Sequence, residues 1–563
     1  MNLHPIVERL LEKRGICAEE REEFLDPSLA RLVRVDALPG VREAAEVILP
    51  FVRDGRKIVV YGDYDCDGVC ASAILVSALR RLGALADAFV PDRFKEGYGL
   101  TAAAIGRLFS EHPDVGLVVT VDNGISSVRE IADIKARGVS VVVTDHHLPG
   151  SDLPAADALV NPRVAAAPGC ADLCGAGVAF FLAGALVQAA QAAGLYSGGK
   201  FAAPLLVLAG LATVADIMPL RGQNRILVAQ SLANFWRCAP LGLKELMRSA
   251  SRVASSTPNA RDYGFLLSPR INATGRLESA ALAYNLLMEQ DREVARNLAV
   301  RVNGINGRRQ TEERELAFAL QSQIASGRPA CVARLETGNT GVVGIVAARL
   351  MERLGVPVAV AVGDTGSVRA PDGYNVRDAL AAATDALDRF GGHAAAGGFT
   401  VKEGRFEDFR RLFTEACAAQ YAESREAIER AKAVEPDLWL EPDDITMELL
   451  DALNVLEPFG EGNPEPVFGL QGVRFSDARP IGAEGQHATF AFVNKAIPRA
   501  VWWNHGVDVE AIRAHDVPRD VLFTLMESDF GGDSHLELKL LAVRAQGQCC
   551  RPGQVLERPI STC

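Results

Sequence analysis

The chain has 563 residues, 48% of them hydrophobic, so it predicts a globular protein of three or four domains rather than a single core. Its formal net charge of −12 excludes a protein that coats nucleic acid with its whole surface, but a local basic channel is compatible with it. No apolar run reaches transmembrane length without charges or turn residues, and the first residues lack a signal-peptide pattern. We therefore expect a cytoplasmic protein. Its eleven scattered cysteines predict reduced, mostly buried thiols.

In chain order, residues 1–40 predict a polar, helical lead-in, and from residue 41 helical and strand patterns alternate. The strand-like runs are 58–61, 85–90, 115–121, 140–144 and 158–160, and the helical runs between them are 71–82, 102–111 and 127–137. This alternation predicts an α/β domain with a parallel sheet covered by helices. Ligands bind such sheets beyond the carboxyl ends of the strands.

Residues 57–68 read Lys-Ile-Val-Val-Tyr-Gly-Asp-Tyr-Asp-Cys-Asp-Gly, a buried strand followed by three aspartates in a loop. Alternate residues of an extended chain point the same way, so Asp63, Asp65 and Asp67 are expected within a few ångströms of one another. Their charges repel unless a cation neutralises them. A polar surface turn explains a single Asp-x-Asp as simply, so the metal interpretation depends on other stretches.

Further acidic and imidazole groups fall at the ends of later apolar runs that we interpret as strands. Asp122 follows the run 118–121, Asp145, His146 and His147 follow 141–144, and Asp216 follows 211–215. Carboxylates with one or two imidazoles favour Mn²⁺ or Mg²⁺ over a structural zinc. Two such ions roughly 3.5–4 Å apart would clamp a phosphoryl group and generate a hydroxide nucleophile.

Four of these stretches, residues 62–68, 121–125, 145–147 and 214–220, resemble the motifs of the DHH phosphoesterase superfamily. They have the form found in the bacterial RecJ single-stranded-DNA exonucleases. The likeness continues through residues 91–99, 268–276, 391–399 and 457–468, and it covers roughly residues 40–545.

By this resemblance, two Mn²⁺ or Mg²⁺ ions would be held by Asp63, Asp65, Asp67, Asp122, His146 and Asp216. His147 would face the phosphate, and Asp145 would orient the imidazoles. Many superfamily members begin the first motif with His where this chain has Asp63. Which of the three aspartates binds a metal directly therefore stays open.

The resemblance also implies phosphate-binding residues. Arg93, Arg276, Ser367 and Arg369 are candidates for the 5′ terminal phosphate, and Arg270, Gly391, Gly392 and His393 for further phosphate or nucleic-acid contacts. Residues 241–276 are locally basic, with six Lys or Arg against two Asp or Glu. Where the family usually has Trp-His, this chain has Gly338-Asn339, so a contact by that His is in doubt.

Residues 278–326 predict one or two long helices, with a bend at Gly304 and Gly307 and with Arg301, Arg308 and Arg309 beside a nucleic-acid path. Residues 434–545 alternate short β-type runs with turns, typical of a small barrel. Among its aromatic residues, Trp502, Trp503, Phe490 and Phe492 are candidates for base stacking or for the barrel core.

The resulting prediction is a parallel-sheet DHH domain and a smaller α/β DHHA1 domain joined by a long helix, plus an OB-fold. Its predicted segments are a lead-in (1–40), the DHH domain (41–275), a connector helix (276–327), the DHHA1 domain (328–425), the OB-fold (434–545) and a tail (546–563).

The predicted function is metal-dependent 5′-to-3′ hydrolysis of single-stranded DNA in DNA repair and recombination, with a helicase and a single-strand-binding protein as partners implied by the resemblance. Two alternatives remain. One is a hydrolase of pyrophosphate or short oligonucleotides, which would not need the barrel. The other is a non-catalytic replication scaffold, but such relatives lose ligands and this chain keeps the full set.

Overall fold

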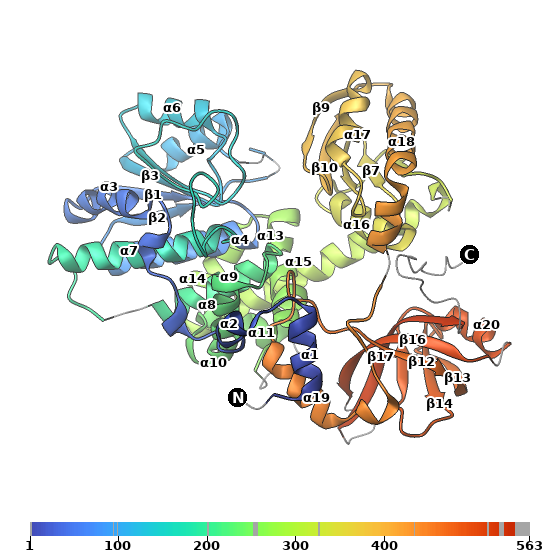
Figure 1. Cartoon of the computed structure of the whole chain (residues 1–563). Coiled ribbons are helices and arrows are strands. Elements are labelled where there is room, and N and C mark those ends of the chain that lie inside the picture. Colours follow the sequence, from blue (N-terminus) through green and yellow to red (C-terminus); the bar gives the residue numbers. More distant parts are fainter. Residues whose placement is uncertain are drawn as a thin grey trace. The chain divides into compact units, whose positions relative to one another are not determined.

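The computed structural model describes residues 3–93, 95–97, 99–199, 202–250, 257–324, 327–432, 434–514, 517–528 and 534–545 (Figure 1). The chain forms two compact units. The larger unit contains residues 19–309 and 456–464, and the smaller unit contains 1–18, 310–455 and 465–563. The predicted tail and Arg252 of the basic segment lie outside the described residues.

The larger unit is built on a five-stranded parallel sheet with the order β2-β1-β3-β4-β5. The strands are β1 (Lys57–Tyr61), β2 (Ala86–Phe89), β3 (Val115–Val121), β4 (Ser140–Thr144) and β5 (Ala158–Val160), which confirms the predicted strands. Successive residues of β1 face two separate apolar cores: Ile58 packs into one and Val59 into the other. Both faces of the sheet are therefore covered, which explains its nearly continuous β-branched runs.

Helices lie on both sides of this sheet (Figure 1). One core contains residues of α5 (Ala102–Glu111) and α6 (Val128–Ala136). The other contains residues of α3 (Val41–Arg53), α4 (Cys66–Arg81), α7 (Gly175–Ala192) and α8 (Ala202–Ala215). The remaining helical segments up to α15 are α2 (Ala18–Leu25), η1 (Leu29–Arg31), η2 (Val35–Ala37), α9 (Gly222–Ala233), α10 (Phe235–Cys238), α11 (Leu241–Ala250), α12 (Ala260–Asp262), η3 (Tyr263–Leu267), α13 (Ser268–Leu277), α14 (Ala281–Met288) and α15 (Arg292–Ala319).

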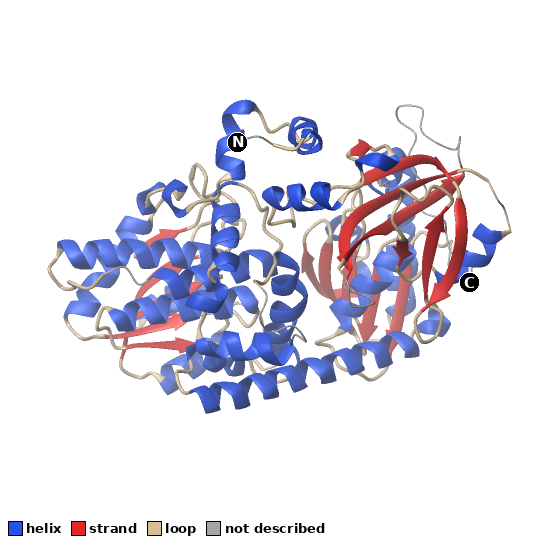
Figure 2. Ribbon diagram, turned by 90° about the horizontal axis from the view of Figure 1, so that it is seen from below, coloured by secondary structure: helices blue, strands red, loops and turns tan. Residues whose placement is uncertain are grey.

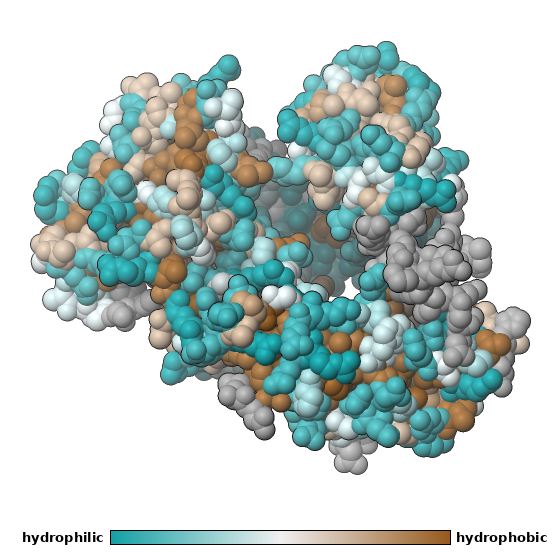
Figure 3. Space-filling model, viewed as in Figure 1, coloured by the Kyte–Doolittle hydropathy of each residue, from teal (hydrophilic) through white to brown (hydrophobic). Residues whose placement is uncertain are grey.

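Among the described residues, α7 alone is long and apolar enough to cross a membrane. In this helix, 61% of the length is buried, and it packs against α3, α4 and α8. It is therefore a core helix of the larger unit. In the space-filling view, the visible face of the molecule is mainly hydrophilic, with scattered apolar patches (Figure 3).

Two local expectations were wrong. The run before Asp216 is the end of the helix α8, not a strand. The fully apolar composition of α8 hid the helical period, because the helix is buried on all sides. The helix α15 also continues through Gly304 and Gly307, where an added Cβ would meet no atom within 4 Å.

The smaller unit contains two sheets, shown as red arrows in Figure 2. The first has the order β6-β7-β8-β10-β9, and the second is a mixed seven-stranded sheet with the order β11-β12-β16-β17-β15-β14-β13, in agreement with the predicted OB-fold. Strands of the first sheet are β6 (Cys331–Leu335), β7 (Val358–Val362), β8 (Thr365–Arg369), β9 (Leu387–Gly392) and β10 (Ala396–Val401). Strands of the second are β11 (Leu438–Trp439), β12 (Phe468–Val473), β13 (Phe475–Ile481), β14 (His487–Phe492), β15 (Ala500–Trp502), β16 (Arg519–Ser528) and β17 (His535–Ala545).

The helical segments of this unit include α1 from the amino terminus, which contacts α19. They are α1 (Pro5–Lys13), η4 (Gln321–Gln323), α16 (Val343–Leu354), α17 (Val376–Ala382), η5 (Thr384–Ala386), α18 (Phe406–Lys432), η6 (Pro442–Asp444), α19 (Met447–Leu453), η7 (Asn454–Leu456), η8 (Gly506–Asp508) and α20 (Val509–Arg513). Of the four predicted stacking aromatics, Phe490, Phe492 and Trp502 are buried, and Trp503 is 45% exposed.

Candidate metal centre

The three aspartates after β1 are held by a helix start rather than by an extended chain. Asp65 is the N-cap of α4, and its Oδ1 accepts hydrogen bonds from the N–H groups of Asp67 and Gly68, both at 3.0 Å. Asp67 therefore lies in the first turn of α4, which corrects the expected alternation of extended residues. Gly68 is required here, because an added Cβ would lie 2.5 Å from the nitrogen of Asp63.

The amino end of α7 supports the carboxylate of Asp67. Its two oxygens accept hydrogen bonds from the N–H groups of Gly175 and Ala176, at 2.6 and 2.7 Å. The positive end of the helix dipole thus stabilises the negative charge of Asp67. An added Cβ on Gly175 would lie only 2.5 Å from Cβ of Asp122, so this close approach requires glycine. Sequence reasoning missed this support, although the Gly-x-Gly at 175–177 was its visible signal.

His146 lies at the centre of the carboxylates. Its Nε2 is 3.1 Å from Oδ1 of Asp122, 3.6 Å from Oδ2 of Asp216 and 3.8 Å from Oδ2 of Asp67. Asp122 directly follows β3 in the left-handed region, with φ of 61°, which aspartate tolerates better than most residues. Its buried Oδ1 accepts no hydrogen bond from the described residues.

Without a cation, burial and mutual repulsion disfavour the charged forms of several carboxyl groups in this cluster. Burial, and then the charge of Asp65, raises the pKa of Asp63 to about 8. Burial, and then the charge of Asp67, raises the pKa of Asp216 to about 8 and that of Asp122 well above its usual range. Three sets of ligand atoms lie within 4.8 Å of one another: Asp122, His146 and His147; Asp67, His146 and Asp216; and Asp63, Asp65 and Asp122. Most of these ligand atoms are carboxylate oxygens, and the buried Oδ1 of Asp122 accepts no hydrogen bond from the described residues. Such a set of oxygen ligands suits a hard divalent cation.

The pKa values of the two adjacent histidines, His146 and His147, are shifted in opposite directions. Burial lowers the pKa of His146, which favours the neutral form that ligates metals. Burial, the largest single effect, acts to lower the pKa of His147. The hydrogen bond with Asp145, together with the charges of Asp145, Asp216 and Asp67, outweighs it and raises the value to about 9. Oδ1 of Asp145 lies 2.8 Å from Nδ1 of His147, and its Oδ2 accepts the N–H of Ile125 at 2.9 Å. Asp145 thus fixes the imidazole of His147.

Two predicted phosphate-binding arginines lie beside the aspartate loop. The guanidinium of Arg93 is 5.2 Å from the ring centroid of Tyr64. Arg276 is near the end of α13, which packs against the loop: a Cβ on its neighbour Gly275 would lie 2.5 Å from the carbonyl oxygen of Tyr64. Arg270, on the same helix, donates to Asn303 and to the carbonyl of Leu266, at 2.8 and 2.7 Å.

The other phosphate candidates lie in the smaller unit. A Cβ on Gly344 would lie 3.0 Å from Nη2 of Arg369 and 3.5 Å from Oγ of Ser367, so both side chains face the first turn of α16. Gly391 and Gly392 form the exposed end of β9, and the N–H of His393 donates to the carbonyl of Ala396 at 2.8 Å. Asn339, in place of the family's His, donates to Oε2 of Glu312 at 2.7 Å. The three arginines of the predicted connector donate hydrogen bonds to other side chains. Arg301 and Arg308 donate to Glu278, and Arg309 donates to Asn306.

A parallel sheet with carboxylates and imidazoles gathered near its carboxyl edge defines the class of metal-dependent phosphoesterases. Three family models match in sequence order: the DHH family N-terminal domain over residues 57–208, the DHHA1 domain over 327–419 and the RecJ OB domain over 436–542. The chain belongs to the RecJ family.

Two curated relatives are both named single-stranded-DNA-specific exonuclease RecJ. The protein of Dickeya dadantii is 36% identical over 83% of this chain and 83% of its own length. That of Bacillus subtilis is 35% identical over 88% of this chain and 62% of its own length. RecJ of Thermus thermophilus, solved with Mn²⁺, gives a TM-score of 0.78 at 31% identity over 97% of this chain and 78% of that chain. The same protein solved with Mg²⁺ gives 0.74 at 30% identity, over 97% and 77%.

Proposed function

We propose that this protein is a metal-dependent exonuclease that hydrolyses the phosphodiester bonds of single-stranded DNA from the 5′ end. The observation that carries the proposal is the cluster around His146, in which a buried oxygen of Asp122 lacks a hydrogen-bond partner among the described residues. The names of the two curated relatives support single-stranded DNA as the substrate.

The metal-binding residues are Asp63, Asp65, Asp67, Asp122, His146 and Asp216. Two divalent ions, Mn²⁺ or Mg²⁺, supply Lewis-acid stabilisation and an activated water when bound there. The α7 amino end donates two hydrogen bonds to the carboxylate of Asp67, and burial lowers the pKa of His146, which favours its neutral imidazole. The ligand atoms of these residues already lie within 4.8 Å of one another in three groups.

His147 contributes a positive charge to the bound phosphate. With a pKa of about 9 it is protonated at neutral pH, and Asp145 occupies its Nδ1. Its Nε2–H is then available to donate to a phosphate oxygen, whose negative charge grows in the transition state. Asp145 is a positioning residue in this proposal.

Phosphate contacts are proposed separately for each unit. In the larger unit, Arg93 and Arg276 lie next to Tyr64, close to the aspartates. In the smaller unit, Ser367 and Arg369 face the amino end of α16, where backbone N–H groups favour anions. Arg270 and the exposed run of Gly391, Gly392 and His393 are assigned to further backbone contacts.

Recognition of a 5′ phosphate predicts the effect of Arg369→Ala. The variant should weaken use of 5′-phosphorylated strands by roughly 1.5–3 kcal/mol, the contribution of a charged hydrogen bond, and affect 5′-hydroxyl strands much less. Single-turnover assays on both substrates measure the difference. Equal losses on both would make Arg369 a general backbone contact and leave polarity to other residues.

The direct test of the function uses single strands labelled at the 5′ or the 3′ end, with a duplex and pyrophosphate as parallel substrates in Mn²⁺. We expect release of 5′-labelled mononucleotides from single strands alone. Hydrolysis of pyrophosphate with intact DNA would favour the small-substrate alternative, and no hydrolysis at all would favour the scaffold. The OB-fold domain and the complete ligand set speak against these alternatives.

Three further expectations are proposals. We propose that the protein acts in the cytoplasm in DNA repair and recombination, and that a helicase and a single-strand-binding protein are its partners. We also retain the division of the chain at residues 41–275, 276–327, 328–425 and 434–545. Affinity capture with purified candidates tests the partners, and limited proteolysis tests the boundaries.

A further inference from the structure

The loop that carries Arg93 follows β2 at the same edge of the sheet as the aspartates. We call residues 90–101, between β2 and α5, the Arg93 loop, and the structure describes all of them except 94 and 98. Because β2 pairs with β1 in parallel, the loop leaves the sheet at the edge where Asp63 follows β1. The guanidinium of Arg93 lies 5.2 Å from the ring centroid of Tyr64, the residue after Asp63. Whatever holds this loop therefore also places Arg93 beside the aspartates.

An arginine of α5 joins two parts of the Arg93 loop. Nε of Arg107 donates to Oε1 of Glu96 at 2.6 Å, and Nη2 donates to Oε2 at 3.0 Å, which makes a forked ion pair. Nη2 also donates to the carbonyl of Val90 at 3.0 Å, where the loop begins. The guanidinium lies 4.0 Å from the ring centroid of Phe89, and this stacking helps to fix its plane. Arg107 therefore ties the middle of the loop to its beginning.

Glu96 holds the backbone immediately before Arg93. Its Oε2 accepts the N–H of Asp92 at 2.6 Å, and its side chain is only 6% exposed. Burial acts to raise the pKa of Glu96, but the hydrogen bonds from Arg107 and Asp92, together with the charge of Arg107, outweigh it and lower the pKa. Glu96 is therefore charged at neutral pH, and its pair with Arg107 is complete.

We propose that Glu96 and Arg107 are positioning residues that hold Arg93 in place for the 5′ phosphate of the strand. The inference rests on the proposed function, since it takes Arg93 as a 5′-phosphate contact. A forked pair constrains direction as well as distance, and a misplacement of about 1 Å can lower a rate by about 10²-fold. The far end of the loop is held separately, because the carbonyl of Gly99 accepts the O–H of Tyr61 at 2.9 Å. Loss of the pair should therefore displace Arg93 without releasing the whole loop.

The test measures steady-state kcat/KM on single strands with a 5′ phosphate and with a 5′ hydroxyl, with Arg93→Ala as the reference variant. Glu96→Gln keeps the shape of the side chain but replaces one oxygen by an NH₂ group, which cannot accept a hydrogen bond from Arg107 or Asp92. We expect kcat/KM to fall about tenfold on 5′-phosphorylated strands, mainly through KM, and less than about twofold on 5′-hydroxyl strands. Arg107→Lys, which keeps the charge but loses the fork, should give the same pattern. Calorimetric titration should show wild-type Mn²⁺ affinity in both variants.

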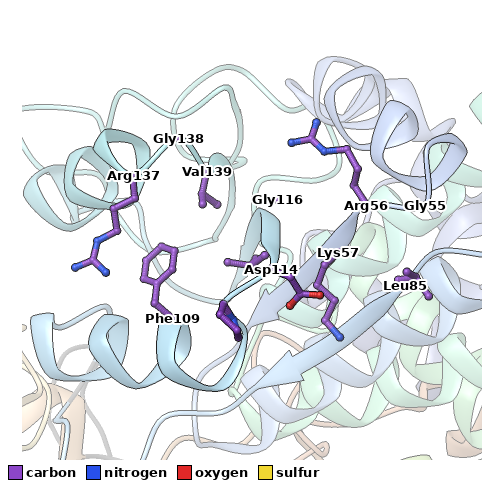
Figure 4. Close-up of a pocket in the computed structure, with 12 residues that line it drawn as sticks. Gly55, Arg56, Lys57, Leu85, Phe109, Asp114, Gly116, Arg137, Gly138 and Val139 are labelled. Atoms are coloured by element: carbon purple, nitrogen blue, oxygen red, sulfur yellow. The ribbon is translucent and has the colours of Figure 1, made fainter.

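Two matched controls leave the Arg93 loop untouched. Glu111→Gln removes the other carboxylate of Arg107, which is 49% exposed and accepts from Nη1 at 3.1 and 3.2 Å. Arg137→Lys changes an arginine that lies 4.5 Å from the ring centroid of Phe109 on the same helix α5. Figure 4 shows this arginine beside Phe109, at a cavity of about 480 Å³ at the amino ends of the strands. Both controls should keep the ratio of kcat/KM between the two substrates within about twofold of the wild type.

A double-mutant cycle separates positioning from general structural damage. Glu96→Gln/Arg93→Ala should lose no more activity on 5′-phosphorylated strands than Arg93→Ala alone, because the pair acts through that arginine. Additive losses, or equal losses of Glu96→Gln on both substrates, would overturn the proposal. A wild-type substrate ratio in Glu96→Gln and Arg107→Lys, beside a lost preference in Arg93→Ala, would overturn it while leaving the proposed function intact. A wild-type ratio in Arg93→Ala would instead remove the phosphate role of Arg93, and the positioning role with it.

Discussion

At the scale of single residues, Asp122 is the carboxylate that most needs a cation. Asn fits the same backbone φ of 61° and the same volume, so Asp122→Asn removes the charge with little strain. We expect turnover to fall by about 10³-fold or more, equivalent to several kcal/mol of lost transition-state stabilisation. Steady-state kinetics with saturating Mn²⁺ measures this, and circular dichroism checks the fold. Near wild-type turnover would remove Asp122 from the metal site.

His147 gives a second residue-scale prediction. His147→Ala should lower turnover about 10²- to 10³-fold, as for a lost oxyanion donor, while metal stoichiometry is nearly kept. Because protonation supplies the charge of this imidazole, its contribution should decline as pH rises through the pKa of His147, which is about 9 in the metal-free protein. A pH–rate profile of wild type and variant measures this difference. Loss of one bound Mn²⁺ per chain would instead identify His147 as a ligand.

At the scale of elements, the amino end of α7 contacts two proposed metal ligands, Asp67 and Asp122. Gly175→Ala would place a Cβ 2.5 Å from that of Asp122, so the helix or the ligand must move. We expect Mn²⁺ affinity to fall about 10- to 100-fold, as for other groups that orient metal ligands. Titration calorimetry with Mn²⁺ measures it.

The matched control is Gly304→Ala in α15, where the added methyl group meets nothing within 4 Å. It should leave Mn²⁺ affinity unchanged and stabilise the helix by roughly 0.5–1 kcal/mol. If Gly175→Ala binds Mn²⁺ as tightly as this control, the contact between α7 and Asp122 does not set the ligand geometry.

At the scale of the whole molecule, the buried carboxyls couple stability to pH and metal. In the metal-free protein the pKa values of Asp63 and Asp216 are raised to about 8, so the folded state binds protons that the unfolded state releases above about pH 4. Stability should therefore fall as pH rises from about 4 to 8. Thermal unfolding in EDTA should show a falling midpoint, and added Mn²⁺ should restore it most at the higher pH. A midpoint that does not depend on pH in EDTA would contradict this coupling.

The sequence by itself determined the sheet strands, and it predicted the residues of the proposed metal site. Short β-branched runs favour buried strands, and acidic residues that follow such strands gather at one edge of a parallel sheet. The same reasoning failed for Asp216, because a nearly wholly apolar helix shows no apolar period. It failed for Asp67 because Asp65 caps α4 and starts the helix earlier than the predicted run 71–82.

Only the tertiary structure decided how the side chains of the cluster are supported and in which direction their pKa values shift. The support of Asp67 by α7 joins residues 108 positions apart, and a close packing contact between Gly175 and Asp122 has no periodic signature. The contrast between the pKa values of His146 and His147 also depends on burial, on one hydrogen bond and on the nearby carboxylate charges, since the two residues are adjacent and identical in type. Local patterns report which residues are present, whereas pKa values and ligand geometry depend on what folding places around them.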